Sequence, residues 1–404
     1  MRILIYGINF SPELTGIGKY SGEMAHWLAN QEHEVLVITT PPYYPEWSIS
    51  DKYKNFFSFK KTKSLSIIRC PLYVPKKPTI IKRLIHLASF SISSFFPMIG
   101  SVFWKPDIII QVVPTLFCSI QTLFVAKLVG ARSIVHVQDY EVDAMFDLSI
   151  AKTSLSKKIA YWLEKKILNS FHTVSTISHG MLKRAVQKGI DKKKLLFFPN
   201  WAEVARFENR SKNKQFLIEL GINPEKKIVL YSGNMGVKQG LELVVYAARS
   251  LKANSDIQFV LVGEGAVKQS LEKLSDELNL KNISFLPLVP YNQLPDLLGS
   301  ADCHLVIQKK GAADAVLPSK LTNILAVGGN SVITASPDTT LGKLCKDFPE
   351  IAVLVEPESV EALVAGIEQS LLMAIPNKIA KSYARKYLDK DIILKRFVKH
   401  FELT

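Results

Sequence analysis

Short apolar runs alternate with longer amphipathic stretches along the first half of the chain. Five of these runs are predicted to be strands: residues 3–6, 34–38, 107–112, 132–137 and 172–177. Apolar strands separated by helical patterns are typical of a parallel sheet that helices cover on both faces. The first half is therefore predicted to be a Rossmann-like domain.

The same rhythm begins again in the second half of the chain. Strands are predicted at residues 227–232, 257–262, 283–286, 304–307, 331–334 and 352–355. Between the two series, a strand from Leu195 ends at Pro199 and leads into a polar segment that extends to about Gly221, which we interpret as the interdomain connection.

We therefore expect an α/β protein with two Rossmann-like domains that face each other across a cleft. Residues 1–205 form the first domain and residues 206–384 the second. The basic, amphipathic stretch at about 385–404 is expected to pack back on the first domain.

Composition and charge narrow the range of partners. The chain has 404 residues, and domains cluster near ~100–200 residues, which agrees with two domains. Its net charge of +15 indicates an anionic partner: nucleic acid, a membrane surface or a phosphorylated small molecule. The positive charge is scattered and no nucleic-acid-binding motif accompanies it, so we expect no nucleic acid partner.

The cysteines and the N-terminus point to the cytoplasm. The four cysteines lie far apart, and no Cys/His cluster has metal-ligand spacing, so we expect reduced thiols and no metal site. The first apolar run meets Gly7 too early for a signal peptide and is interpreted as a first strand.

One segment departs from the α/β pattern. Residues 84–104 contain no charged side chain and follow a basic flank of Lys76, Lys77, Lys82 and Arg83. The length approaches the ~20 residues of a spanning helix, but His86, five serines and Pro97 weaken that interpretation. Two alternatives remain: a helix and loop packed on the sheet, or an interfacial helix that contacts the anionic inner membrane from its cytoplasmic face.

A glycine-containing loop follows the first predicted strand. It carries Gly16 and Gly18 before a helix from about Ser21 to Asn30, and glycines there let backbone amides approach a phosphate or a sugar. The pattern is not a dinucleotide fingerprint, because Ser21 stands at the third glycine position and the loop is long. This disfavours a nicotinamide-dependent oxidoreductase.

The second half opens with a strand, a glycine-rich loop and a helix. The loop contains Gly233, Asn234, Lys238 and Gln239, and its amides, with Lys238 as counter-charge, could hold a diphosphate. The turn around Glu264 after the next strand could contact the same ligand or be a plain strand turn.

A second candidate phosphate site lies further along this half. Pro318, Ser319 and Lys320 are predicted to begin a helix, whose first amides and positive dipole end favour an anion, with Lys320 adding a full charge. Asn323 lies one turn along the same face. The plainer alternative is a capped helix with a solvated lysine.

Polar residues also follow the predicted strand at residues 132–137. A lone His136 is more simply a satisfied core histidine, whereas carboxylates just after a buried strand need a reason. Because polar side chains at this edge face the ligand in open α/β folds, we predict that Gln138, Asp139 and Glu141 do so.

With these loops the chain resembles, over nearly its full length, the retaining family 4 glycosyltransferases of the GT-B fold. The strings that carry the resemblance are residues 6–20, 70–76, 113–118 and 138–145. The resemblance implies a nucleotide-diphosphate sugar as donor, specifically GDP-fucose, and a lipid-linked oligosaccharide acceptor in exopolysaccharide (colanic-acid-like) biosynthesis. It implies no cofactor besides the donor, since the leaving diphosphate itself accepts the acceptor proton.

The family's glycines match positions of this chain, but its charged residues do not. Gly16 and Gly18 match the glycine loop beside the donor phosphates and acceptor, and Gly233 matches the phosphate-loop glycine. The arginine and lysine expected after that glycine are Asn234 and Gln239 here.

The family's pair of glutamates falls at Ala315 and Asn323. We expect Ser319 and Lys320 to take over part of the diphosphate contact and Asn323 the sugar or ribose contact. Asp314 is the acid nearest to the missing glutamate. The catalytic candidates are therefore Asp314 together with Asp139 and Lys320. In this family the protein is expected to act mainly by stabilising departing negative charge.

Two activities outside transfer remain as alternatives. Loss of both glutamates would suit a catalytically impaired nucleotide-sugar-binding or scaffold subunit of a polysaccharide assembly complex. The double Rossmann pattern alone would suit an oxidoreductase, against which the failed fingerprint argues.

Overall fold

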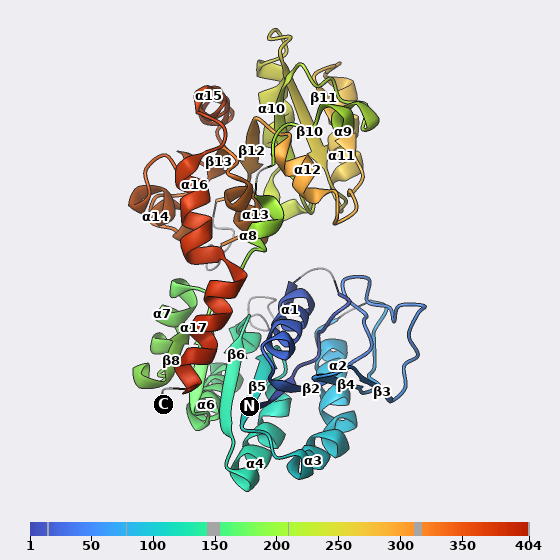
Figure 1. The fold of residues 1–404 in the computed structure, drawn as a ribbon. Helices are drawn as coiled ribbons and strands as arrows, with labels where there is room; N and C mark the ends of the chain where they lie inside the picture. Colours follow the sequence, from blue (N-terminus) through green and yellow to red (C-terminus); the bar gives the residue numbers. More distant parts are fainter. Residues whose placement is uncertain (14–15, 78, 144–153, 209, 311–316, 403–404) are drawn as a thin grey trace. The chain divides into compact units, whose positions relative to one another are not determined.

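The computed structural model describes residues 1–404 except 14–15, 78, 144–153, 209, 311–316 and 403–404 (Figure 1). The chain forms two compact units, Met1–Pro199 and Asn200–Thr404. Each unit is built on one sheet with helices on both faces, so the predicted α/β class with two largely parallel sheets is confirmed.

The first unit contains an eight-stranded sheet of order β3-β4-β2-β1-β5-β6-β7-β8. Its strands are β1 (Arg2–Tyr6), β2 (Glu34–Thr39), β3 (Ser58–Lys61), β4 (Leu65–Arg69), β5 (Ile108–Val113), β6 (Arg132–Val137), β7 (Thr173–Thr176) and β8 (Leu195–Phe197). Only β3, which pairs with β4, is antiparallel among the described strands. The prediction missed β3 and β4. All four residues of β3 are exposed and give no apolar run, and β4 is a strand of 5 residues whose apolar positions are interrupted by Ser66.

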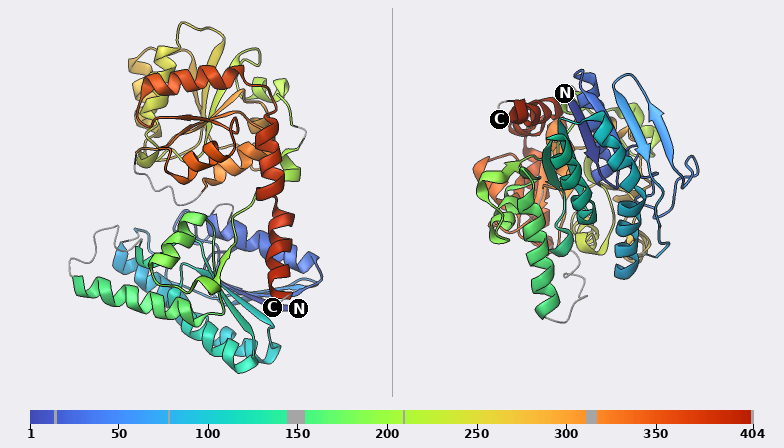
Figure 2. Two further views of the ribbon diagram at one scale, coloured as in Figure 1. Left: turned by 90° about the vertical axis from the view of Figure 1, so that its left-hand side faces the viewer. Right: turned by 90° about the horizontal axis from the view of Figure 1, so that it is seen from below.

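Helices cover both faces of this sheet (Figure 2). They are α1 (Gly16–Asn30), α2 (Ile80–Ser93), α3 (Phe95–Trp104), α4 (Ser119–Val129), α6 (Ser154–Ser170) and α7 (His179–Gln187), with short 3₁₀ turns η1 (Leu116–Cys118) and η2 (Lys192–Lys194). Helix α1 begins at Gly16, five residues before the predicted start at Ser21. Small buried residues such as Gly18 let its first turns lie close to the preceding loop, so part of the predicted glycine loop is helical.

The second unit contains a six-stranded parallel sheet of order β11-β10-β9-β12-β13-β14. Its strands are β9 (Lys227–Ser232), β10 (Ile257–Val262), β11 (Ile283–Leu286), β12 (Cys303–Val306), β13 (Ser331–Thr334) and β14 (Val353–Val355). Alternate residues of β9 enter different cores, Leu230 on one face and Tyr231 on the other. Since both faces are buried, the strands are nearly continuous apolar runs, which explains why the sequence predicts them within one or two residues.

The helices of this unit surround its sheet. They are α8 (Val204–Phe207), α9 (Lys214–Glu219), η3 (Val237–Gln239), α10 (Glu242–Ser250), α11 (Lys268–Glu277), α12 (Leu294–Gly299), α13 (Ser319–Val327), α14 (Thr340–Asp347), α15 (Val360–Leu372), α16 (Lys378–Tyr383), a π turn η4 (Ala384–Leu388) and α17 (Lys390–Glu402). Packing of the C-terminal helix on the first unit stays a prediction.

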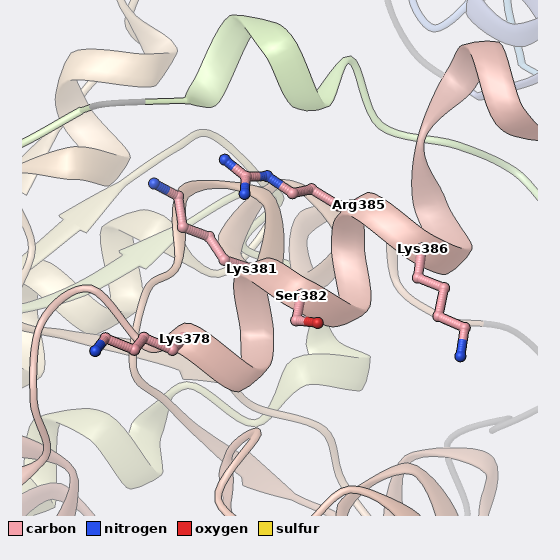
Figure 3. Close-up of a pocket in the computed structure, with 5 residues that line it drawn as sticks. All are labelled: Lys378, Lys381, Ser382, Arg385 and Lys386. Carbon is pink, nitrogen blue, oxygen red and sulfur yellow. The ribbon is translucent and has the colours of Figure 1, made fainter.

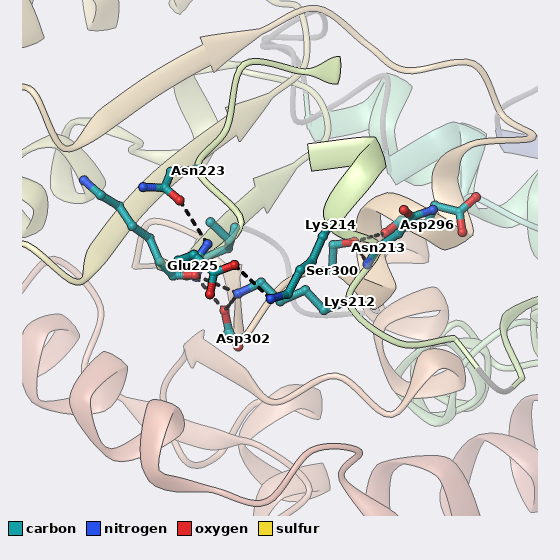
Figure 4. A network of polar contacts seen from close by, with 10 residues as sticks. Lys212, Asn213, Lys214, Asn223, Glu225, Asp296, Ser300 and Asp302 are labelled. Carbon is teal, nitrogen blue, oxygen red and sulfur yellow. Dashed lines mark hydrogen bonds and ion pairs between the residues drawn. The ribbon is translucent and has the colours of Figure 1, made fainter. Parts of the chain in front are cut away.

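Most of the polar segment interpreted as an interdomain connection is fastened to the second sheet (Figure 4). Lys212 forms an ion pair with Asp302 at 2.9 Å, and the same carboxylate accepts the Ile228 amide at the start of β9. The Asn213 amide donates to the Ser300 hydroxyl at 3.0 Å. These contacts make the segment from about residue 212 part of the second unit.

Candidate active site

Both sheets have a topological switch point where a ligand crevice is expected. In the first sheet the strands that follow β1 lie on both of its sides, β2 on one and β5 on the other; in the second sheet β10 and β12 flank β9 in the same way. Ligands of open α/β sheets bind at the carboxyl ends of strands at such points. A ligand is therefore expected near the residues that follow β1 and β5 in the first sheet and β9 and β12 in the second, and β6 lies beside β5 at the same edge.

At the switch point of the second sheet, Lys320 lies against the loop that follows β9. Its Nζ donates to the Tyr231 hydroxyl at 2.9 Å and lies 4.1 Å from the centroid of the same ring. A Cβ added to Gly233 would stand 3.2 Å from this Nζ, so the missing side chain leaves room for the ammonium group. The structure thus brings together Gly233 and Lys320, which are 87 positions apart in the sequence.

Desolvation changes the acidity of this lysine. Lys320 is partly buried, and desolvation of its ammonium group lowers the pKa of Lys320 to about 8. No carboxylate among the described residues forms an ion pair with it. A bound anion would stabilise the charged form of this ammonium group, which burial disfavours.

Helix α13 presents its N-terminus beside the same loop. Pro318 is the N-cap residue with an extended backbone, φ −57° and ψ 134°, and no side chain caps the helix. Amides in the first turn of a helix have no intrahelical partner, so those of Ser319 and Lys320 point toward the crevice with the positive end of the dipole. The helix starts at Ser319, as the sequence predicts. Ser319 is exposed, and Asn323, one turn further on, is half-buried.

The loop between β9 and η3 rests on the next turn of the sheet. The Gly233 amide donates to the Val262 carbonyl at 2.9 Å, and the Met235 amide to the Glu264 carbonyl at 2.8 Å. A Cβ at Gly265 would stand 2.6 Å from the Met235 carbonyl carbon, and one at Gly263 would clash with the Gly233 carbonyl. The turn around Glu264 is therefore a support for the loop.

The remaining predicted residues of this loop differ in availability. Asn234 and Lys238 are exposed, whereas the Gln239 side chain accepts the Gly236 amide at 3.1 Å and so caps the loop. The Glu264 carboxylate pairs with Lys268 at 2.8 Å. Of these four side chains, Asn234 and Lys238 are the ones available to a ligand.

In the first unit, the glycines predicted to approach a ligand have two different surroundings. Gly16 is exposed with a φ of +58°, and nothing would contact a Cβ there. Gly18 is buried, and its Cβ would stand 2.6 Å from the Cβ of Glu13. The glycine at position 18 is explained by the close approach of Glu13, while Gly16 keeps an open backbone.

Glu13 itself is a buried carboxyl that the sequence analysis missed. Its Oε1 accepts the amides of Tyr43 and Tyr44 at 3.2 and 3.1 Å, and its Oε2 accepts the Asn9 side chain at 3.0 Å. Burial raises the pKa of Glu13, an effect that these hydrogen bonds and Arg69 partly offset. The carboxyl connects the loop after β1 to the loop after β2.

The polar residues at the end of β6 and just after it take three roles. His136 is buried and bonded to Ser175 and Gln138, both at 2.9 Å, and burial lowers the pKa of His136 to about 3, so it is the satisfied core histidine. Glu141 is buried and accepts the Leu116 amide at 3.0 Å, and desolvation raises the pKa of Glu141 to about 7. Asp139 is exposed at the edge of the sheet.

The predicted Asp314 and the family position Ala315 lie outside the described residues. Among the residues that the structure does describe, no three of the His, Cys, Asp and Glu side chains come together in a group that could hold a metal ion.

A separate basic pocket of about 410 Å³ lies on α16 and the π turn (Figure 3). It is lined by Lys378, Lys381, Ser382, Arg385 and Lys386. Arg385 pairs with Glu208 at 2.9 Å, and the aliphatic part of Lys381 covers Gly328 at the end of α13. These cations form a solvated helix face, unlike the desolvated ammonium group of Lys320.

Comparison with known proteins identifies the family of this chain. A family model described as "Glycosyl transferases group 1" matches residues 212–387, and one described as "Glycosyl transferase 4-like domain" matches residues 15–201. The chain belongs to the glycosyltransferases, and it is an enzyme of that class with the GT-B fold.

Two similar proteins are named as glycosyltransferases. WcaI of Escherichia coli strain K12, named as a colanic acid biosynthesis glycosyl transferase, is 53% identical over 98% of this chain and 99% of its own. WbjE of Pseudomonas aeruginosa, named as a glycosyltransferase, is 26% identical over 60% of this chain and 62% of its own.

Solved structures agree on the fold. A sucrose-phosphate synthase from Thermosynechococcus elongatus superposes with a TM-score of 0.72 at 16% identity, over 100% of this chain and 98% of that one. Anabaena HepE in complex with UDP gives 0.69 at 12% identity, over 100% of both chains. The predicted GT-B fold is therefore confirmed.

Proposed function

We propose that this glycosyltransferase moves fucose from GDP-fucose, with retention of configuration, onto a lipid-linked oligosaccharide during the biosynthesis of colanic acid or a similar exopolysaccharide. The polysaccharide comes from the name of the relative at 53% identity. The donor sugar and the acceptor come from the resemblance described for the sequence.

The observation that carries the donor site is the placement of Lys320. A desolvated ammonium group, an uncapped helix start and a glycine backbone meet at the switch point of the second sheet. Such a constellation stabilises negative charge that develops on a departing diphosphate, which is the main task in this reaction class. In the proposal, Lys320 and Ser319 bind the diphosphate and Asn323 the ribose or sugar.

The first unit is proposed to receive the acceptor. Asp139 is exposed at the sheet edge, and Gly16 offers open backbone. The proposal needs no cofactor besides the donor, and activity retained after dialysis against EDTA is the expected consequence.

A membrane contact is part of the proposal, because the acceptor carries a lipid. The region Ile81–Trp104 is long and apolar enough to span a bilayer by length and composition, and 28% of its most apolar window is buried. It is two helices, α2 and α3, separated at Ser94, and α3 packs against α4.

The outer faces of these three helices expose large apolar side chains, which we call the apolar helix face. Its members are Ile81, Ile85, Ile92, Phe96, Phe103, Ile120, Phe124 and Leu128. Phe103 is 89% exposed and Phe96 77%. The three helices contain no Asp or Glu, and Lys82, Arg83 and Lys127 lie exposed among them. Apolar side chains edged by cations suit the interface of an anionic bilayer.

The transferase reaction is tested with purified protein, GDP-fucose and a lipid-linked acceptor. The proposal predicts an α-linked fucosylated product. If a product forms only with another donor from a panel of GDP- and UDP-sugars, the proposed donor is wrong. If no donor in the panel gives a product, the proposal of sugar transfer is overturned.

The membrane contact is tested by flotation with phosphatidylglycerol vesicles. Phe96→Glu with Phe103→Glu should release the protein, and wild-type binding should weaken with salt because surface charges are screened. The matched control is Ile218→Glu, which changes an isoleucine 56% exposed on α9. Equal flotation of the double variant and wild type would remove the apolar helix face from the proposal.

A further inference from the structure

Tyr231, the residue before the last of β9, joins the two halves of the proposed donor site. It is fully buried, with its ring in the core of the second unit. Its hydroxyl donates to the Asn234 carbonyl at 2.6 Å and accepts from Lys320 Nζ at 2.9 Å. One side chain therefore contacts both the loop after β9 and the first turn of α13.

We propose that Tyr231 is a positioning residue for donor binding: it holds the Lys320 ammonium group and the backbone around Asn234 in the arrangement that receives a diphosphate. This inference rests on the proposed function, because it assumes that the diphosphate binds at Lys320. Neither the resemblance nor the names of the relatives assign a role to this tyrosine.

The physical reason is that an unrestrained lysine binds an anion poorly. Fixing a long, flexible lysine side chain costs rotamer entropy. The ring of Tyr231 holds the ammonium group by a cation–π contact, and the hydroxyl accepts one of its hydrogen bonds. Lys320 is thus ordered before the ligand arrives, which is the general benefit of preorganisation.

The hydroxyl has a second task in the loop. Gly233 has a φ of +146°, a conformation that places the following carbonyl of Asn234 within reach of the Tyr231 hydroxyl. Burial raises the pKa of Tyr231, so the hydroxyl remains protonated and can donate to this carbonyl while it accepts from Lys320. A phenylalanine would keep the ring but remove both hydrogen bonds.

A purely structural tyrosine would act without Lys320. In that case Tyr231→Phe would disturb the loop, and its effect would be the same whether or not residue 320 carries an ammonium group. The positioning role predicts instead that the two residues depend on each other, which a double-mutant cycle measures.

The test is calorimetric binding of GDP and of UDP at pH 7 to four full-length proteins: wild type, Tyr231→Phe, Lys320→Ala and the double variant. Hydrogen bonds to charged groups contribute about 1.5–3 kcal/mol, so we expect Tyr231→Phe to weaken nucleotide binding about tenfold. In the Lys320→Ala background the same change should cost clearly less, because only the hydrogen bond to the Asn234 carbonyl is then left to lose. The pH above which affinity falls should also move lower in Tyr231→Phe, because its ammonium group loses an acceptor.

The matched control is Tyr383→Phe, a change to a half-buried tyrosine of α16 that packs against Phe348. It should leave nucleotide affinity unchanged. Equal losses for Tyr231→Phe in both backgrounds, or no loss in either, would overturn the inference while the donor site stands. A wild-type protein that binds neither nucleotide would overturn the proposed function and the inference with it.

Discussion

At the carboxyl edge of the first sheet the desolvated groups include two carboxyls and a cation, Arg69, which partly offsets one of them. At the same edge of the second sheet, Lys320 is a desolvated cation with no ion-pair partner among the described residues. Burial raises the pKa of Glu13 and brings that of Glu141 to about 7. Burial lowers the pKa of Lys320 to about 8. Two units of one α/β architecture thus offer different electrostatics to a ligand.

The difference teaches that the side chains after the strands, and not the topology, decide what each unit binds. Buried carboxyls that accept backbone amides hold loops in place and offer no positive charge to a phosphate. An ammonium group without a carboxylate partner among the described residues attracts phosphate. This is why the proposal places the donor diphosphate on the second unit.

Removal of the cation is the strongest way to break this comparison. Lys320→Ala should lower the affinity for GDP by about one to two orders of magnitude, since a hydrogen bond to a charged group contributes about 1.5–3 kcal/mol. Calorimetry measures the affinity, and Lys252→Ala, an exposed lysine of the same unit, is the control. Unchanged affinity in Lys320→Ala would contradict the assignment.

The packing role of Gly18 is tested by a pair of glycine variants in the first unit. In Gly18→Ala the new Cβ would stand 2.6 Å from the Cβ of Glu13, whereas nothing lies within 4 Å at Gly100. Overpacking costs about 1–3 kcal/mol, so Gly18→Ala should lower the Tm by several degrees.

Gly100→Ala should instead raise the Tm slightly, because alanine favours a helix by about 1 kcal/mol over glycine. Thermal unfolding measures the direction of the Tm shift for each of the two variants. If the two variants shifted the Tm in the same direction, the close approach of Glu13 would not be what requires a glycine at position 18.

The pH dependence of stability tests the carboxyl side of the comparison. The folded state keeps the proton of Glu141 up to a pKa of about 7, whereas the unfolded state loses it near 4.5. Between these values the folded state binds more protons, so the contribution of Glu141 to stability falls as pH rises. Glu141→Gln should remove this fall and raise the Tm at pH 8 by about 2–4 °C, which is about 1 kcal/mol.

At pH 4.5 the same variant should melt close to wild type, since both side chains are then neutral and can accept the Leu116 amide. Melting curves at pH 4.5 and pH 8 decide the matter. An equal shift at both values would mean that the Glu141 carboxyl is not the group that titrates.

The smallest effect is expected at the other cation of the second unit. Lys238 is exposed beside the phosphate loop, and exposed ion pairs contribute about 0.2–1 kcal/mol. Lys238→Ala should therefore weaken GDP binding by less than about fivefold, and added salt should remove the difference. A loss as large as that of Lys320→Ala would make charge, and not desolvation, the deciding property.

The sequence predicted the parts of the fold that carry an apolar signal. Strands such as β9 are buried on both faces, and their apolar runs mark them directly. Strand β3 was missed because it is exposed, and α1 was started too late because its first turn contains glycines that usually indicate loops. Both misses come from tertiary packing that a local pattern does not encode.

The candidate site was predictable only as separate pieces. Gly233 and Lys320 each stood out by their local motif, but their contact depends on the order of β9 and β12 in the sheet. Glu13 and Tyr231 were missed because a single carboxyl and a strand tyrosine carry no motif. A signal was available for Tyr231 in hindsight, since a hydroxyl at the end of a buried strand needs a partner.

The central claim is most directly tested by proton uptake when GDP binds at pH 8. With a pKa of about 8, Lys320 is about half protonated there, and a bound diphosphate should complete its protonation. Calorimetry in two buffers of different ionisation enthalpy should therefore give an uptake of about half a proton for wild type and none for Lys320→Ala. Binding with no proton uptake in wild type, or the same uptake in both proteins, would contradict the account.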